Sequence, residues 1–256
     1  MNKLQFLGTG AADFAKLRAA NIPDRLDADA RRSSAALLHG HMLIDCGPHT
    51  LDCLRILGIA QECITDLFIT HLHSDHFDPE NVRTLAKNRP GLRIFVSDAA
   101  MMPEIPGAVV IPMEKYRSYT VADGVTVTAV DANHDADFAP QHYLFDFDGK
   151  KLLYALDGAW FINKSYNFLK GCGLSVLVID ATCGDYEGDF RMAEHNSIPM
   201  IRLMLPSLRT VGIVNDNTKI VLSHLAPSLH DTHENTVNNA ARDGLSVAYD
   251  GMEMEF

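Results

Sequence analysis

The stretch Leu67-Phe68-Ile69-Thr70-His71-Leu72-His73-Ser74-Asp75-His76 places three imidazoles and one carboxylate within six residues, directly after an apolar run. Such a run is typical of a buried strand, so the polar groups begin where that strand ends and a loop starts. Imidazole and carboxylate groups are ligands for zinc, manganese or iron. Without a metal, the cluster would crowd unpaired polar groups at a strand end. The stretch therefore predicts a metal-binding loop.

Four ligands in one loop can hold parts of two metal ions but cannot complete the coordination of both. Three further candidates each follow a strand-like segment: His134 after 125–130, Asp157 after 151–156 and His224 after 218–222. Ligands gather at the carboxyl ends of strands in α/β sheets. Each of these residues alone could be an ordinary loop residue, but together with the loop they favour a second set of metal ligands.

Short segments rich in Val, Ile, Leu, Phe and Tyr alternate with helical patterns along the whole chain. The predicted strands are 3–7, 35–38, 42–45, 66–70, 93–97, 108–111, 125–130, 142–147, 151–156, 174–180, 218–222 and 245–249. The predicted helices are 49–57, 79–88, 198–209 and 232–243, and 11–33 is predicted to be a long loop. The two halves resemble each other in kind. This organisation predicts a four-layer αββα sandwich, formed by one domain over residues 1–256.

Composition limits the classes of partner. The 33 acidic residues exceed the 22 basic ones, for a net charge of −11, and this surface disfavours long nucleic acids. The sequence contains no run of about 18 apolar residues, the length needed to predict a membrane span. The five cysteines are odd in number and form no CxxC pair, which favours free thiols in the cytoplasm. A small anionic substrate is the expected partner, and a homodimer is compatible with the sequence.

The set His71-x-His73-x-Asp75-His76, followed by His134, Asp157 and His224, resembles the metallo-β-lactamase superfamily of hydrolases. The resemblance covers nearly the whole chain and implies the αββα sandwich with two adjacent divalent metal ions, zinc or manganese, with iron as a further candidate. It assigns His71, His73 and His134 to the first ion. It assigns Asp75, His76 and His224 to the second ion, with Asp157 as the bridge between the two.

Shorter motifs resemble one branch of the superfamily, which contains RNase Z and the cyclic phosphodiesterase of phosphonate-degradation operons. They are Phe6–Gly10, Arg31–Ser34, His195–Ser197 and Ala248–Met252. Two features depart from that branch. The segment 11–33 has no Cys for the structural zinc that many members carry. The 22 residues between His134 and Asp157 leave no room for the tRNA-gripping arm that many RNase Z members have there.

The resemblance implies a metal-activated hydroxide that attacks a small or cyclic phosphodiester, with Asp75 counted as a catalytic residue as well as a ligand. His195 is the candidate general acid for the leaving oxygen, because the other seven residues already complete both metal sites. Its alternative is a surface histidine at a helix N-terminus. Gly8, Thr9, Gly10 and Arg31 are candidate phosphate contacts, although a plain turn and a solvated arginine explain them equally well.

Other activities remain open at this stage. A lactone or thioester hydrolase would use the same metals without His195 as an acid. An RNase Z-like endoribonuclease is disfavoured by charge and by the absent arm. A non-catalytic scaffold is disfavoured because all seven ligands are present, and an iron redox enzyme because the chain is too short for a flavin domain.

Overall fold

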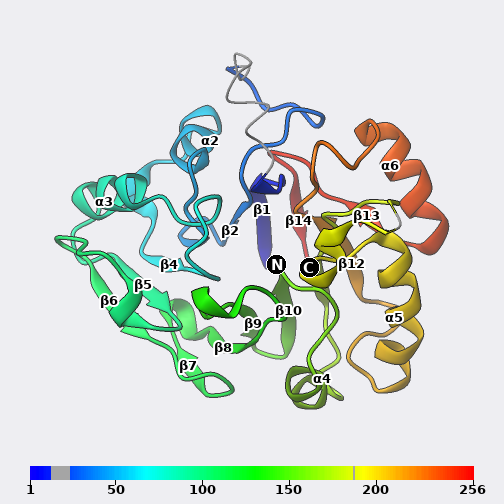
Figure 1. Ribbon diagram of the computed structural model, residues 1–256. Coiled ribbons are helices and arrows are strands. Elements are labelled where there is room, and N and C mark those ends of the chain that lie inside the picture. The colour runs from blue at the N-terminus through cyan, green and yellow to red at the C-terminus, as the bar shows by residue number, and fades with distance from the viewer. Residues whose placement is uncertain (13–23, 187) are drawn as a thin grey trace. The chain divides into compact units, whose positions relative to one another are not determined.

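The structure is a computed structural model that describes residues 1–12, 24–186 and 188–256 (Figure 1). The chain forms two compact units. Unit 1 comprises 1–114 and 249–255, and unit 2 comprises 115–248 with Phe256. The C-terminal segment therefore returns to the first unit. The single domain predicted over 1–256 stays a prediction, and residues 13–23 of the loop predicted at 11–33 lie outside the described residues.

Unit 1 contains a mixed sheet of seven strands within the described residues. In sheet order these are β14 (Glu253–Glu255), β1 (Lys3–Gly8), β2 (Ala35–Leu38), β3 (Met42–Ile44), β4 (Asp66–Phe68), β5 (Arg93–Val96) and β6 (Val109–Pro112). Strands β3 to β6 are parallel, so their carboxyl ends meet at one edge. The helices of this unit among the described residues are α2 (Thr50–Ile56), α3 (Pro79–Asn88), η2 (Gln61–Cys63) and η3 (Ala99–Met101).

Unit 2 also contains a mixed sheet of seven strands within the described residues. In sheet order these are β13 (Ser246–Val247), β12 (Lys219–Ser223), β11 (Val176–Asp180), β10 (Lys150–Ala155), β9 (Gln141–Phe147), β8 (Thr126–Asp131) and β7 (Ser118–Thr120). Its helices are α4 (Asn163–Leu169), α5 (Ile198–Thr210), α6 (His233–Ala240), η4 (Ala122–Gly124), η5 (Ala136–Phe138), η6 (Phe190–Ala193) and η7 (Ala241–Asp243). Strands β10 to β13 are parallel.

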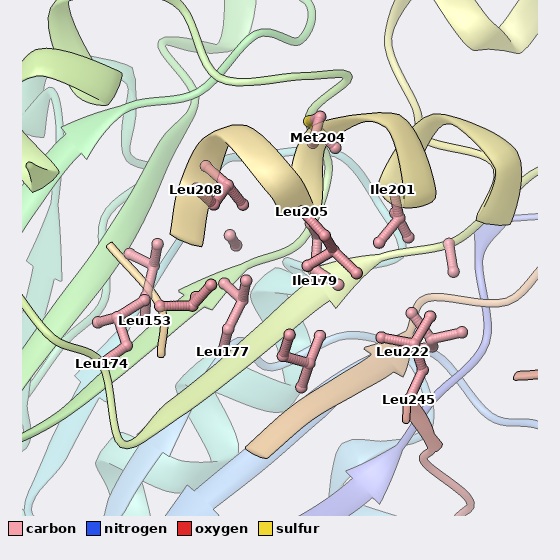
Figure 2. Packing of buried hydrophobic residues seen from close by; sticks show 14 of the residues in the cluster. Leu153, Leu174, Leu177, Ile179, Ile201, Met204, Leu205, Leu208, Leu222 and Leu245 are labelled. Carbon is pink, nitrogen blue, oxygen red and sulfur yellow. The ribbon is translucent and has the colours of Figure 1, made fainter. Parts of the chain in front are cut away.

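Helix α5 shows how the sequence covers this second sheet. The Ser197 side chain accepts a hydrogen bond from the backbone N–H of Met200 and so caps the first turn. Apolar residues then recur every three or four positions and put one face of the helix on the strands. Ile201, Leu205 and Leu208 are at most 3% exposed and belong to the same cluster as Ile179 (Figure 2). Burial of this face stabilises the helix in place.

The predicted elements are confirmed with small shifts at their ends. All twelve predicted strands and four predicted helices are present, with the fourth helix ending as the short η7. The Asp148-Gly149 pair forms the predicted tight hairpin, with φ of 53° and 92°. Asp123-Gly124 likewise turns the chain between β7 and β8. The strands β7 and β14, the helix α4 and the short helices η2 to η6 were not predicted from the sequence.

Candidate metal centre

In unit 1 the ligand loop connects a buried strand to a helix. It leaves the end of β4 and runs into α3, whose N-terminus is capped by the Asp78 carboxylate through the N–H groups of Glu80 and Asn81. A Cβ on Gly47 would lie 1.9 Å from the carbonyl oxygen of Asp75. Only glycine therefore lets the segment after β3 approach the loop this closely.

Asp45, directly after β3, orients the ligand loop through contacts with Thr70 and His76. Its fully buried carboxylate accepts hydrogen bonds from the N–H and hydroxyl of Thr70, at 2.8 to 3.0 Å. Its Oδ2 lies 2.7 Å from Nδ1 of His76. Burial raises the pKa of Asp45, and the contact with His76 opposes that rise. A carboxylate on one ring nitrogen fixes the ring and leaves Nε2 to act as a ligand.

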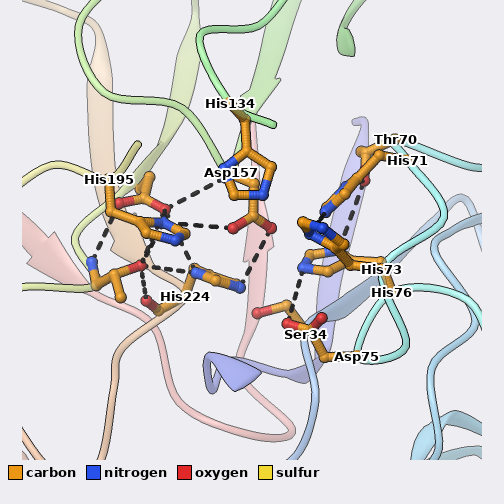
Figure 3. A network of polar contacts seen from close by, with 12 residues as sticks. Ser34, Thr70, His71, His73, Asp75, His76, His134, Asp157, His195 and His224 are labelled. Carbon is orange, nitrogen blue, oxygen red and sulfur yellow. Dashed lines mark hydrogen bonds and ion pairs between the residues drawn. The ribbon is translucent and has the colours of Figure 1, made fainter. Parts of the chain in front are cut away.

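The remaining ring nitrogens of the loop converge. Nε2 of His71 lies 3.0 Å from Nδ1 of His73, and Nε2 of His76 lies 3.3 Å from Oδ2 of Asp75 (Figure 3). Two ligands at the usual zinc–nitrogen distance in a tetrahedral shell lie about 3.3 Å apart. The loop therefore presents two pairs of donor atoms at spacings that suit a shared cation.

In unit 2 the candidate ligands come from separate strand ends. Asp157 follows β10 and His224 follows β12, with β11 between these strands in the sheet. Both residues adopt positive φ, 52° and 58° respectively, which is uncommon for residues other than glycine. Oδ2 of Asp157 lies 3.2 Å from Nε2 of His224, and both side chains are at most 4% exposed. The parallel strands thus bring together two residues 67 positions apart in the sequence (224 − 157).

Asp180, the last residue of β11, anchors this second set. Its fully buried carboxylate accepts hydrogen bonds from the backbone N–H groups of Asp157 and Asn196, at 3.2 and 2.9 Å. It also lies 3.0 Å from Nδ1 of His195 and 3.3 Å from Nδ1 of His224. Burial would raise the pKa of Asp180, but the charges and hydrogen bonds of the two histidines hold it well below its usual range.

His195 lies in the middle of this cluster. Its ring stacks on His224, with centroids 5.5 Å apart, and lies 5.1 Å from the ring of His134. Nδ1 faces Asp180, and it is also 3.3 Å from Oδ1 of Asp157. Burial would lower the pKa of His195, but the negative charge of Asp180 outweighs it and the pKa is raised. The Asp180 contact fixes the ring orientation and turns Nε2 away from the anchor.

Three other contacts in unit 2 involve the candidate ligands and His195. Nδ1 of His134 lies 3.7 Å from Oε2 of Glu194, and the His134 side chain is 3% exposed. The Thr182 hydroxyl lies 2.7 Å from Nδ1 of His224 and 3.2 Å from Nδ1 of His195. The donor atoms of Asp157, Asp180, His195 and His224 all lie within 4.8 Å of one another, a spacing at which they could hold a metal ion.

Comparisons with known proteins agree with this chemistry. Residues 41–213 match the family model of the beta-lactamase superfamily domain. The chain belongs to the metallo-β-lactamase superfamily. A search of curated protein sequences finds no significant match. The predicted fold class and family are therefore confirmed, as is the coarser functional prediction of a metal-dependent hydrolase.

Solved structures with the same fold span the whole chain. Zn(2+)-bound PqqB from Methylobacterium extorquens has a TM-score of 0.74 and 14% identity, over 99% of this chain and 100% of that one. The short form of human tRNase Z has a TM-score of 0.67 and 20% identity, over 99% and 98%. Yeast PDE1 has a TM-score of 0.68 and 11% identity, over 100% and 99%. At these identities the likeness concerns the fold alone.

The candidate phosphate contacts occupy a different setting in unit 1. A Cβ on Gly8 would lie 2.1 Å from the backbone oxygen of Ser33, and one on Gly10 would lie 3.0 Å from Cβ of Arg31. Both glycines therefore allow the two chain segments to pack closely. The Thr9 hydroxyl donates to Oδ1 of Asp250 at 2.8 Å and accepts from Arg31 at 2.7 Å. Arg31 is only 4% exposed. The predicted substrate contact of these residues stays a prediction.

Sequence reasoning missed the two anchors, Asp45 and Asp180, and the linking hydroxyl of Thr182. The signal for both anchors was present, because each is an aspartate at the end of an apolar strand, as Asp157 nearly is. The ligand roles predicted for the seven histidines and aspartates stay predictions. No helix in the described residues is long and apolar enough to cross a membrane, and all five cysteines are free.

Proposed function

We propose that this chain hydrolyses small or cyclic phosphodiesters with two divalent metal ions. The observation that carries the proposal is the anchored histidine of unit 2. His195 lies beside the candidate ligands Asp157 and His224, yet its Nδ1 is held by Asp180. A histidine fixed in this way can deliver a proton from Nε2 to the oxygen of a leaving alcohol.

The donor set supports the metal part of the proposal. Two metal ions need more ligands than one loop offers, and the family resemblance assigns seven, which are His71, His73, Asp75, His76, His134, Asp157 and His224. Imidazole with carboxylate suits zinc and manganese, and it also suits iron. Bound divalent ions would activate water and neutralise the charge of a phosphodiester.

Within this scheme the chain's own residues have separate tasks. Asp45 holds His76, and Asp180 holds His224 and His195, so that each ring presents a defined nitrogen. His195 protonates the leaving oxygen. A thioester hydrolase would have less need for an anchored acid, because a thiolate leaves without prior protonation. The acidic surface favours a small anionic substrate over a long nucleic acid.

A substrate panel tests the proposal. The metal-loaded protein is assayed with Mn²⁺ and with Zn²⁺ on bis(p-nitrophenyl) phosphate, p-nitrophenyl phosphate, an aliphatic lactone and an acyl thioester. We expect kcat/KM for the diester to exceed that for the monoester by about a hundredfold or more, a difference of roughly 2.7 kcal/mol in barrier. Faster turnover of the lactone or thioester than of every diester would contradict the proposal.

A further inference from the structure

Unit 2 carries an apolar groove whose lining includes Trp160, three residues after the candidate ligand Asp157. It has a volume of about 250 Å³ and is lined by residues from α4, α5 and the segment that follows Asp157. Its apolar lining comprises Trp160, Phe161, Leu203, Met204 and Leu208. Trp160 is 41% exposed and Leu203 is 72% exposed, so the groove is open to solvent. No lining side chain is charged, in an otherwise acidic chain.

A hydrogen bond joins the two helices that line the groove. The hydroxyl of Tyr166, on α4, lies 2.6 Å from the hydroxyl of Ser207, on α5. Met204 and Leu208, on α5, are 7% and 1% exposed and belong to the buried core of unit 2. The floor and the far wall of the groove are therefore part of the packed structure and keep their shape without a ligand.

The wall of the groove formed by Trp160 is connected to the ligand cluster by hydrogen bonds between backbone and side-chain groups. Trp160 has a φ of 57°, a strained value for an aromatic residue, and its N–H donates to Oδ1 of Asn196 at 2.8 Å. The Asn196 amide donates in turn to the carbonyl of Gly158 at 2.8 Å, and its backbone N–H donates to Asp180 at 2.9 Å. Trp160 is thus held between the segments that carry Asp157 and His195.

We propose that this groove binds an aromatic or similarly sized apolar group of the substrate, on the ester that is not cleaved. The proposal rests on the phosphodiesterase function proposed above, because a diester keeps a second ester group whereas a monoester has none. An apolar cavity of about 150 Å³ already accommodates benzene. A groove of about 250 Å³ therefore has room for one ring and the atoms that join it to phosphorus.

The chain provides its own probe, because Trp160 is its single tryptophan. Intrinsic fluorescence of the metal-loaded protein is followed during titration with phenylphosphonate and with methylphosphonate. We expect phenylphosphonate to change the fluorescence and to bind about tenfold more tightly, the gain from burying roughly 50 Å² of apolar surface. Leu203→Asn places a polar amide at the groove and should reduce this preference to about twofold.

A kinetic arm uses methyl and phenyl esters of p-nitrophenyl phosphate, which share one leaving group. The wild-type protein should favour the phenyl ester by about tenfold in kcat/KM, and Trp160→Ala and Leu203→Asn should remove most of that preference. The matched control is Phe190→Ala, because Phe190 is 84% exposed and lies outside the groove. It should leave the ratio unchanged.

The two arms separate the two proposals. Equal binding of both phosphonates, or a phenyl-to-methyl ratio that Leu203→Asn does not alter, overturns the groove even if diesters are hydrolysed. Selective binding of phenylphosphonate that Leu203→Asn abolishes supports the groove even if no diester is hydrolysed, and in that case only the phosphodiesterase function fails.

Discussion

The two units build their ligand sets in opposite ways. Unit 1 uses one loop, in which four candidate ligands lie within six residues, and its anchor Asp45 reaches a single histidine. Unit 2 collects its set from several strand ends and loops, and its anchor Asp180 contacts two histidines and three backbone N–H groups. A loop fixes its ligands through local backbone geometry, whereas dispersed ligands depend on one shared buried group. Damage to the anchor should therefore spread further in unit 2.

The strongest test removes the residue proposed to serve both metal ions. Asp157→Ala should lower the metal content from two equivalents to less than one and reduce kcat/KM for the diester by about 10⁴, or roughly 5.5 kcal/mol, because both ions depend on this carboxylate. Elemental analysis and diester kinetics measure the two effects. The control is Asp216→Ala, since Asp216 is exposed. Full activity with one equivalent of metal in the wild-type protein would rule out the dinuclear model.

The next test distinguishes the acid from the ligands within unit 2. His195→Ala should lower kcat by about 10² to 10⁴ while both metals stay bound, because the residue donates a proton and holds no metal. The loss should be largest for alkyl leaving groups and smallest for p-nitrophenolate, which needs little protonation. The comparison variant, His76→Ala in unit 1, should lose metal instead.

Two outcomes would revise the role of His195. Loss of a metal ion from His195→Ala would make the residue a ligand, a role that its distance from Asp157 and His224 allows. An equal loss of kcat for good and poor leaving groups would mean that His195 positions the phosphate. Kinetics on a series of leaving groups, together with metal analysis of the same samples, separates these cases.

The anchors allow the two units to be compared directly. Asp180→Asn should reduce activity or metal affinity by about 10- to 100-fold, the usual range for a carboxylate that orients ligands. Asp45→Asn should have an effect near the lower end of that range, because Asp45 contacts the ring of His76 directly but reaches His71 only through the Thr70 hydroxyl. Metal affinity and the leaving-group dependence are measured for both variants. Equal effects would show that the number of contacts an anchor makes does not matter here.

The same contrast explains what could be predicted from the sequence. The loop set was visible because its ligands are contiguous, and His134, Asp157 and His224 because each follows an apolar strand. Asp45 and Asp180 have that pattern too, but a strand-end aspartate does not reveal whether it faces a metal or supports a neighbour. That distinction depends on side-chain direction and burial, which arise only when the strands pair.

Missed elements have a related explanation. Strand β7 has three residues, with Ser118 and Thr120 exposed, and β14 consists of Glu253, Met254 and Glu255. Each has a single apolar residue in three, too short an alternation to predict a strand, and both form because an already folded sheet offers an edge to pair with. Helix α4 has no side-chain cap and few buried residues, so the sequence carries little signal for it. Its position depends on packing against the rest of unit 2.

The smallest expected effect concerns the glycines that let the chain approach each ligand set. Gly47→Ala should destabilise the protein by about 1 to 3 kcal/mol, because the new Cβ would meet the backbone oxygen of Asp75 at 1.9 Å and displace the loop. Gly158→Ala should cost about 1 kcal/mol, since its Cβ would meet a side chain, that of His142, at 2.8 Å. Gly149→Ala, in an open hairpin at a φ of 92°, is the control for backbone strain alone, again about 1 kcal/mol.

Urea unfolding measures the free energy of unfolding for all three variants, and metal titration measures whether the ligand set is also disturbed. Gly47→Ala should weaken metal binding in addition to stability, because the carbonyl that it displaces belongs to a candidate ligand. Gly149→Ala should leave metal binding unchanged, since the hairpin contains no candidate ligand. If Gly47→Ala and Gly149→Ala lower stability equally and neither affects metal binding, the close approach of β3 and the loop has no role in shaping the set in unit 1.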